Sequence, residues 1–136
     1  MNQIEALAQR AAEVRRTGQG NCCQSVALTL CEGAGTDPET LKMLAAGFGG
    51  GMGSMQGDCG ALIGAVMAAG LALGGKGAIP TARRIQAEFK RRCGALTCRE
   101  LKGVDTGKVL CPCEDCVRNA VYAFGDALGG TDAFGA

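Results

Sequence analysis

The first third of the chain reads as helices separated by short polar or glycine-containing breaks. Residues 2–16 carry apolar side chains every three or four positions with charged ones between them, a spacing that predicts an amphipathic helix. The stretch TGQG ends this helix, and a second, more apolar helix is expected over about residues 22–32. A third is expected from Asp37, because aspartate is a preferred N-cap and Pro38 suits the first helical position.

The rest of the chain continues the helical pattern after a glycine-rich loop at 47–57. The most apolar helix is expected over about 59–73. Further helices are expected over about 81–92, 98–102 and 113–128. No segment shows the sustained alternation of a strand. The pattern therefore predicts an all-α fold, with one domain over 1–136, a helical bundle of about five to seven helices with a glycine-rich loop, and a loosely ordered tail at 129–136.

The run from Cys59 to Gly75 contains no charged residue and is near the lower length limit of a membrane span, about 17 residues. Gly60 and Gly64 also have the spacing of paired membrane helices. The chain offers no second span, however, and glycine dilutes the hydrophobicity. We therefore expect a buried central helix and no membrane span. The N-terminal segment lacks the uninterrupted apolar stretch of a signal peptide, which predicts a cytoplasmic protein.

Composition excludes several kinds of chemistry. The chain has 14 Lys and Arg against 13 Asp and Glu, no Trp, one Tyr and four Phe. This near-neutral, aromatic-poor composition argues against a nucleic-acid partner, which needs positive charge or stacking surfaces. The chain also has no histidine. Ser-His and Cys-His catalysis, His-ligated zinc and a His-ligated haem are therefore excluded, and the chemistry falls to cysteines, carboxylates or backbone.

Four of the nine cysteines stand where helices are expected to begin. Cys22 follows Asn21 in a capping-box pattern, Cys59 follows Asp58, Cys98 follows Thr97, and Cys113 follows Pro112. They are Cys22, Cys59, Cys98 and Cys113. A helix start stabilises a thiolate by about 0.3–1 kcal/mol, so these positions favour reactive or metal-binding cysteines. They are our candidates for both catalytic and metal-ligating residues.

If the four helix starts converge, their thiolates repel one another. Two charges about 4 Å apart repel by roughly 4 kcal/mol at an effective dielectric of 20. Protonation, disulfide formation or a metal must relieve this repulsion. An iron–sulfur cluster accepts four thiolates, and glycine backbone can approach its sulfurs closely. The candidate cofactor-binding glycines are Gly49, Gly50, Gly51, Gly53 and Gly60.

Several sequence segments together resemble one protein family. NCCQSV, GFGGGMG, CGALIG, CREL and a late cysteine before Val117 are similar, in order and spacing, to the C_GCAxxG_C_C family over about residues 20–122. The resemblance places the family's four cysteines on Cys22, Cys59, Cys98 and Cys113, with Cys111 or Cys116 as alternatives for the fourth. It implies a small, redox-active bacterial protein, often encoded near transporter genes, and hence a redox partner protein that is transporter-linked.

Three functions agree with these residues. The first is electron transfer by an iron–sulfur cluster, or a related metal centre, on the four candidate cysteines. The second is a metal-free thiol–disulfide oxidoreductase that uses Cys59 with a neighbour such as Cys22. The third is a zinc-stapled binding module without turnover. The zinc site would draw on Cys93, Cys98, Cys113 and Cys116.

Two kinds of partner are expected. The segment from Thr81 to Lys102 is rich in Lys and Arg and offers a docking surface for an acidic redox partner, since complementary charge speeds encounter. The glycine ridge and apolar helices favour a homodimer.

Overall fold

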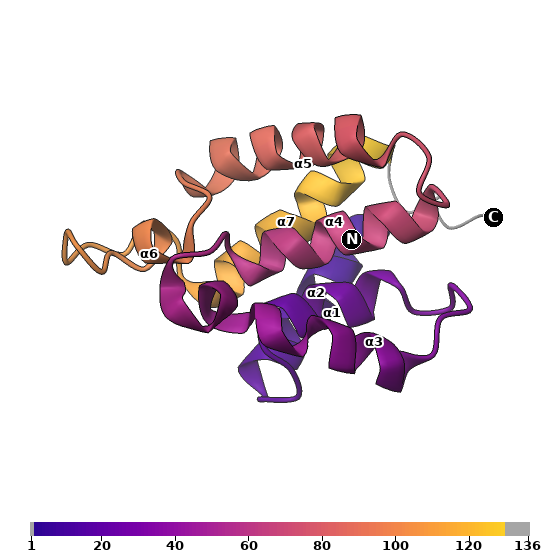
Figure 1. The fold of residues 1–136 in the computed structure, drawn as a ribbon, viewed down its shortest axis with the longest axis horizontal. Helices are drawn as coiled ribbons and strands as arrows, with labels where there is room; N and C mark the ends of the chain where they lie inside the picture. The colour runs from indigo at the N-terminus through magenta and orange to yellow at the C-terminus, as the bar shows by residue number, and fades with distance from the viewer. Residues whose placement is uncertain (1, 130–136) are drawn as a thin grey trace.

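The computed structural model describes residues 2–129, and within that range the chain is all-α (Figure 1). Its elements, in chain order, are α1 (Gln3–Arg16), α2 (Cys22–Leu30), α3 (Pro38–Ala45), η1 (Ala46–Phe48), η2 (Gly51–Met55), α4 (Gly60–Ala72), α5 (Ala78–Cys93), α6 (Cys98–Leu101) and α7 (Cys113–Leu128). The predicted all-α class is confirmed. Of the expected loose tail, only Gly129 lies in the described part of the chain.

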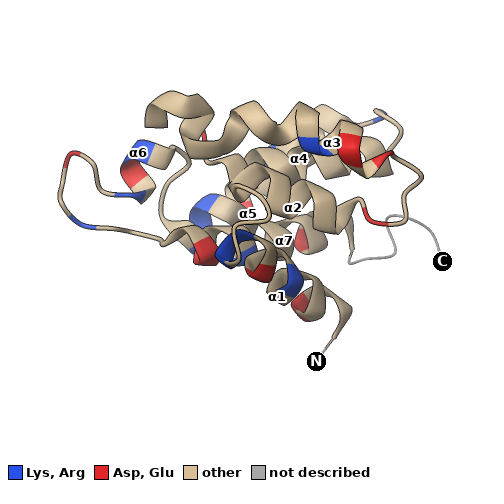
Figure 2. Cartoon of the chain, turned by 90° about the horizontal axis from the view of Figure 1, so that it is seen from below, with Lys and Arg blue, Asp and Glu red and all other residues tan. Residues whose placement is uncertain are grey.

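The central helix is α4, and it packs against α2, α5 and α7, while α1 packs against α7 and α2 (Figure 1). Helices α4 and α2 carry no charged residue, whereas α5 and α7 do (Figure 2). The buried face of α4 is made of Gly, Ala and Leu, and the largest buried side chains of the core include Phe89 and Phe124. No helix among the described residues is long and apolar enough to cross a membrane.

Small residues let α2 and α4 approach closely, as the sequence predicts. A Cβ added at Gly60 would lie 2.5 Å from Cys22 Sγ, and one at Gly64 would lie 2.7 Å from the Cys23 carbonyl oxygen. Glycine is therefore required at both positions. This close contact sets the start of α2 beside the start of α4, which is where Cys22 and Cys59 stand.

Helix α5 begins at Ala78 rather than at about residue 81. Two other helix boundaries differ from the predictions for identifiable reasons. Asp58 does not cap α4, because it forms an isolated antiparallel bridge with Thr97, and Cys59 itself is the N-cap residue. Helix α2 ends at Leu30, with Cys31 as its C-cap rather than inside the helix. At the start of α4 the competing hydrogen bonds come from the segment around Thr97. The periodicity of a sequence gives no signal of a contact between segments so far apart in the chain.

Candidate functional site

The starts of α2, α4, α6 and α7 meet at one small internal cavity of about 80 Å³. The structure brings all four candidate cysteines to its wall and adds a fifth. The cavity is lined by Arg15, Asn21, Cys22, Gly50, Cys59, Cys98, Lys102, Cys113 and Cys116. Cysteines therefore dominate a space that is larger than the roughly 30 Å³ that one water occupies in the liquid.

Local capping holds Cys22 at the first turn of α2. The Asn21 side chain accepts a hydrogen bond from the Gln24 backbone N–H at 3.0 Å, and the Asn21 N–H donates to Gln24 Oε1 at 3.0 Å. The amide of Asn21 also donates to the Ala46 carbonyl at 2.9 Å. One residue thus caps the helix that carries Cys22 and ties it to the segment that precedes the glycine-rich loop.

A short antiparallel bridge between Asp58 and Thr97 joins the segments that carry Cys59 and Cys98. The N–H of Cys59 donates to the Leu96 carbonyl at 2.7 Å, and the N–H of Cys98 donates to the Gly57 carbonyl at 3.0 Å. The two cysteines therefore sit on adjacent strands of backbone that begin α4 and α6. This pairing is what lets helices from distant parts of the sequence share a site.

The glycine-rich loop closes one side of the cavity. Gly50 lines the cavity with a φ of 62°, and the Gly50 backbone hydrogen-bonds the Cys22 sulfur. A Cβ on Gly51 would lie 2.7 Å from Cys98 Cβ, and one on Gly49 would lie 2.5 Å from the Asn21 amide. Gly53 is exposed and has no heavy atom within 4 Å of such a Cβ. Four of the five candidate glycines therefore contact the site or its cap, and Gly53 does not.

Burial and neighbouring thiols raise the pKa of three cysteines of the cavity wall, Cys22, Cys59 and Cys98. A hydrogen bond to Cys59 and burial raise the pKa of Cys22 well above its ordinary value. A hydrogen bond to Cys116, together with burial, raises the pKa of Cys59 to about 12. Burial also raises the pKa of Cys98. The expected lowering by helix starts is therefore wrong for these three residues, because desolvation and neighbouring thiols outweigh a helix-end effect of about 1 kcal/mol.

Two cations border this group of thiols. Lys102 Nζ donates to the Cys111 carbonyl at 2.9 Å and contacts Cys116 Sγ at 3.5 Å. Burial would lower the pKa of Lys102, but the sulfurs of Cys116, Cys113 and Cys59 raise it above its usual value. Arg15 also lines the cavity, and its buried Nε has no hydrogen-bond partner among residues 2–129.

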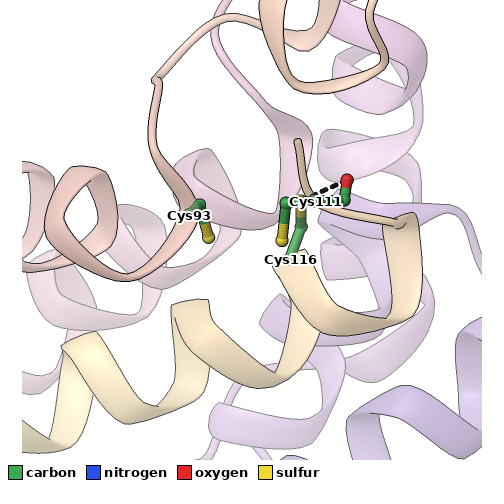
Figure 3. A group of neighbouring side chains, drawn as sticks. All are labelled: Cys93, Cys111 and Cys116. Carbon is green, nitrogen blue, oxygen red and sulfur yellow. Dashed lines mark hydrogen bonds between the residues drawn. The ribbon is translucent and has the colours of Figure 1, made fainter. Parts of the chain in front are cut away.

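Beside the cavity lies a second group of sulfurs, formed by Cys93, Cys111 and Cys116. All three are buried, their sulfurs lie within 4.8 Å of one another, and the group could hold a metal ion. Figure 3 shows the three side chains converging from the end of α5, the segment before α7, and the first turn of α7. We call Cys93, Cys111 and Cys116 the triad, and Cys116 belongs both to it and to the cavity.

The triad corrects the zinc grouping inferred from the sequence. That grouping joined Cys93 and Cys116 to Cys98 and Cys113, whereas the structure replaces the last two with Cys111. The reason is the segment after α6, which folds back so that the N–H groups of Leu110 and Cys111 donate to the Leu101 carbonyl at 2.9 and 3.3 Å. Gly103, where a Cβ would lie 2.2 Å from the Lys108 carbonyl oxygen, is the sequence signal for this reversal.

The remaining two cysteines pack in the core. Cys23 is fully buried, with its sulfur 3.8 Å from Met67 Sδ, and Cys31 is 4% exposed. Cys113, in contrast, is half-buried and also lines a surface depression of about 430 Å³. Arg15 lines the same depression. Among the cysteines of the cavity wall, Cys113 is therefore the most exposed.

A helical protein whose buried cysteines converge on one cavity, with cations beside them, belongs to the class of cysteine-based redox or metal proteins. The family described as "Putative redox-active protein (C_GCAxxG_C_C)" matches residues 20–126, which include every residue of the cavity wall except Arg15, and the chain belongs to this family. Searches of curated proteins and of solved structures gave no match.

Proposed function

We propose that the protein transfers electrons by means of an iron–sulfur cluster that Cys22, Cys59, Cys98 and Cys113 hold in the cavity. The observation that carries the proposal is the convergence of these four buried or half-buried thiols on one cavity. Four cysteines on one cavity match the four thiolates that an iron–sulfur cluster takes as ligands.

The charges around the cavity support an anionic occupant. An iron–sulfur cluster with four thiolate ligands carries net negative charge. The buried Arg15 Nε lacks a hydrogen-bond partner within the described chain. Lys102, at the end of α6, contacts Cys116 Sγ at 3.5 Å. A buried donor without a partner costs about 1–3 kcal/mol, and an anion in the cavity offsets that cost.

The weak acidity of the thiols favours this function over metal-free thiol–disulfide exchange. Exchange requires a thiolate, and active-site cysteines of that kind have a lowered pKa. Here the pKa of Cys59 is raised to about 12 and that of Cys22 is raised as well. A metal ion, in contrast, displaces the proton of each thiol when it binds, because the ion and the proton compete for the same sulfur.

When bound, the cluster supplies a one-electron redox couple. The chain supplies the surroundings of the cluster. The buried walls exclude water, Arg15 and Lys102 offset negative charge, and Gly50 brings a backbone hydrogen bond to the Cys22 sulfur. Cys113 links the cavity to the surface depression, which gives electrons a short route to a partner.

The proposed partner is a redox protein that docks over the depression beside Cys113. The other candidate surface, the basic stretch at 81–102, is partly neutralised, because Arg92 pairs with Glu88 at 3.1 Å and with Asp126 at 2.9 Å. All nine cysteines are free thiols, which fits a reducing, cytoplasmic compartment.

The test is anaerobic purification followed by iron and sulfide analysis and a visible absorption spectrum. We expect bound iron and sulfide with broad visible absorption, and loss of both in Cys59→Ser and Cys98→Ser. The matched control is Cys31→Ser, which removes an equally buried thiol away from the cavity and should keep the cluster. A folded wild-type protein that takes up no iron, even after reconstitution, would contradict the proposal.

If the cluster is absent, redox titration of the thiols tests the metal-free alternative. The hydrogen bond between Cys22 and Cys59 shows that these two are close enough to interact. Their oxidation would form one S–S bond and release two protons and two electrons to an acceptor. Reversible loss of two thiols in the wild type, but not in Cys59→Ser, would favour that function.

A further inference from the structure

We propose that the triad Cys93, Cys111 and Cys116 is a second metal site that binds one zinc ion. The three sulfurs lie within 4.8 Å of one another. Zinc–sulfur bonds of about 2.3 Å in a tetrahedral site hold sulfurs about 3.8 Å apart. Side-chain adjustments of a fraction of an ångström therefore convert the observed group into a zinc site. Three sulfurs this close to one another suit a single ion.

The balance of charge selects a divalent ion. The three cysteines are between 0% and 5% exposed, so an uncompensated charge among them is costly. Three thiolates with Zn²⁺ leave one negative charge, and the Lys102 ammonium, 3.5 Å from Cys116 Sγ, cancels it. A monovalent ion such as Cu⁺ would leave one net negative charge even after Lys102 is counted. The soft sulfur donors exclude Mg²⁺ and Ca²⁺.

A neighbouring polar side chain completes the arrangement. The Asn119 amide donates to Cys93 Sγ at 3.4 Å and approaches Cys111 Sγ at 3.9 Å. Donors of this kind orient metal-bound sulfur and stabilise its charge, and removing one costs about 10–100-fold in metal affinity. Zinc with three protein ligands keeps a fourth, exchangeable position.

The site would serve the redox cavity in two ways. It would fasten the end of α5, the segment that returns from α6, and the first turn of α7, all of which meet at the triad (Figure 3). It would also hold Cys116, which lines the cavity, as a zinc thiolate. Cys116 would then not enter disulfide exchange with Cys59, to whose thiol it is hydrogen-bonded.

The experiment is zinc titration of the reduced, metal-depleted full-length protein in competition with a chromogenic chelator, with Co²⁺ as an optical probe. We expect one zinc per chain and a Co²⁺ spectrum with sulfur-to-metal charge transfer. Cys93→Ser and Cys111→Ser should each weaken zinc binding by more than tenfold. Asn119→Leu, which keeps all three ligands and a similar side-chain volume, should weaken it by about tenfold or more. Cys31→Ser and Cys98→Ser should leave the zinc affinity unchanged.

The outcomes separate this site from the proposed cluster. Zinc binding lost in Cys93→Ser but kept in Cys98→Ser supports the triad whether or not iron is present. Unchanged zinc affinity in folded Cys111→Ser and Asn119→Leu, checked by circular dichroism, would overturn it.

Discussion

Cys116 joins the two sulfur groups of this protein at the scale of a single residue. Its side chain lines the cavity, belongs to the triad, and contacts Lys102 at 3.5 Å. Within the triad, hydrogen bonds from Cys116 and Cys93 lower the pKa of Cys111, while a hydrogen bond to Cys111 raises the pKa of Cys116. The neighbouring thiols therefore favour loss of the proton from Cys111, the form in which a cysteine ligates a metal.

At Gly60 the lack of a side chain is required by the site itself. We predict that Gly60→Ala lowers the free energy of unfolding by about 1–3 kcal/mol, because the new methyl group would lie 2.5 Å from Cys22 Sγ and 2.6 Å from the Phe48 carbonyl oxygen. The variant should also hold less metal in the cavity. Urea unfolding and iron analysis measure the two effects.

Gly70→Ala is the matched control for this prediction. Gly70 lies in the same helix, but a Cβ there meets no heavy atom within 4 Å. Alanine should therefore stabilise α4 by about 0.5–1 kcal/mol. Equal stability changes in the two variants would contradict the role given to Gly60.

At the scale of the element, the candidate cysteines lie at the starts of four helices, α2, α4, α6 and α7. Cys22, Cys98 and Cys113 are the first residues of α2, α6 and α7, and Cys59 is the N-cap of α4. These starts could be read from the sequence because capping depends on residues three or four positions apart. The cap of α4 could not, because the partner of the Cys59 N–H is the Leu96 carbonyl, brought in by a distant segment.

The cap of α2 provides a test at this scale. We predict that Asn21→Ala and Asp37→Ala, which remove the side-chain caps of α2 and α3, each lower the free energy of unfolding by about 0.5–2 kcal/mol. Only Asn21→Ala should also reduce metal binding in the cavity, because Asn21 positions Cys22 and bonds to the Ala46 carbonyl.

Chemical denaturation measures the free energy of unfolding of both variants, and metal analysis measures how much metal each variant holds. Asp37 serves as the control because it caps its helix in the same way, through the Thr40 N–H at 3.0 Å, and does not line the cavity. An equal loss of metal from both variants would show that general destabilisation, and not the position of Cys22, is responsible.

At the scale of the whole molecule, burial of so many thiols makes stability depend on pH. Burial raises the pKa of Cys23 from 9.0 to about 12 and that of Cys31 from 9.0 to about 11. The folded protein therefore keeps protons that the unfolded chain releases above about pH 9. The stabilisation is fully present below that pH and is lost as the pH rises toward 11–12, with a limiting slope of about 1.4 kcal/mol per pH unit for each thiol.

Urea unfolding of the reduced, metal-free protein between pH 7 and 10 tests this dependence. We expect the free energy of unfolding to fall at the alkaline end, and the slope to be smaller in Cys31→Ala. Val26→Ala, in the helix that Cys31 ends and fully buried, should lower stability at every pH without changing the slope. The same slope in Cys31→Ala and the wild type would refute the assignment.

The sequence by itself determined the helical class, most helix positions and the four cysteines at helix starts, because periodicity, caps and glycine placement act over a few residues. Only the tertiary structure decided which sulfurs meet. The bridge between Asp58 and Thr97 joins the segments that carry Cys59 and Cys98. The return of the chain after α6 places Cys111 in the triad, where the sequence had suggested Cys98 and Cys113. The acidity of the thiols was decided in the same way, because burial and neighbouring sulfurs exist only once distant segments have packed, and together they outweigh the local field of a helix end.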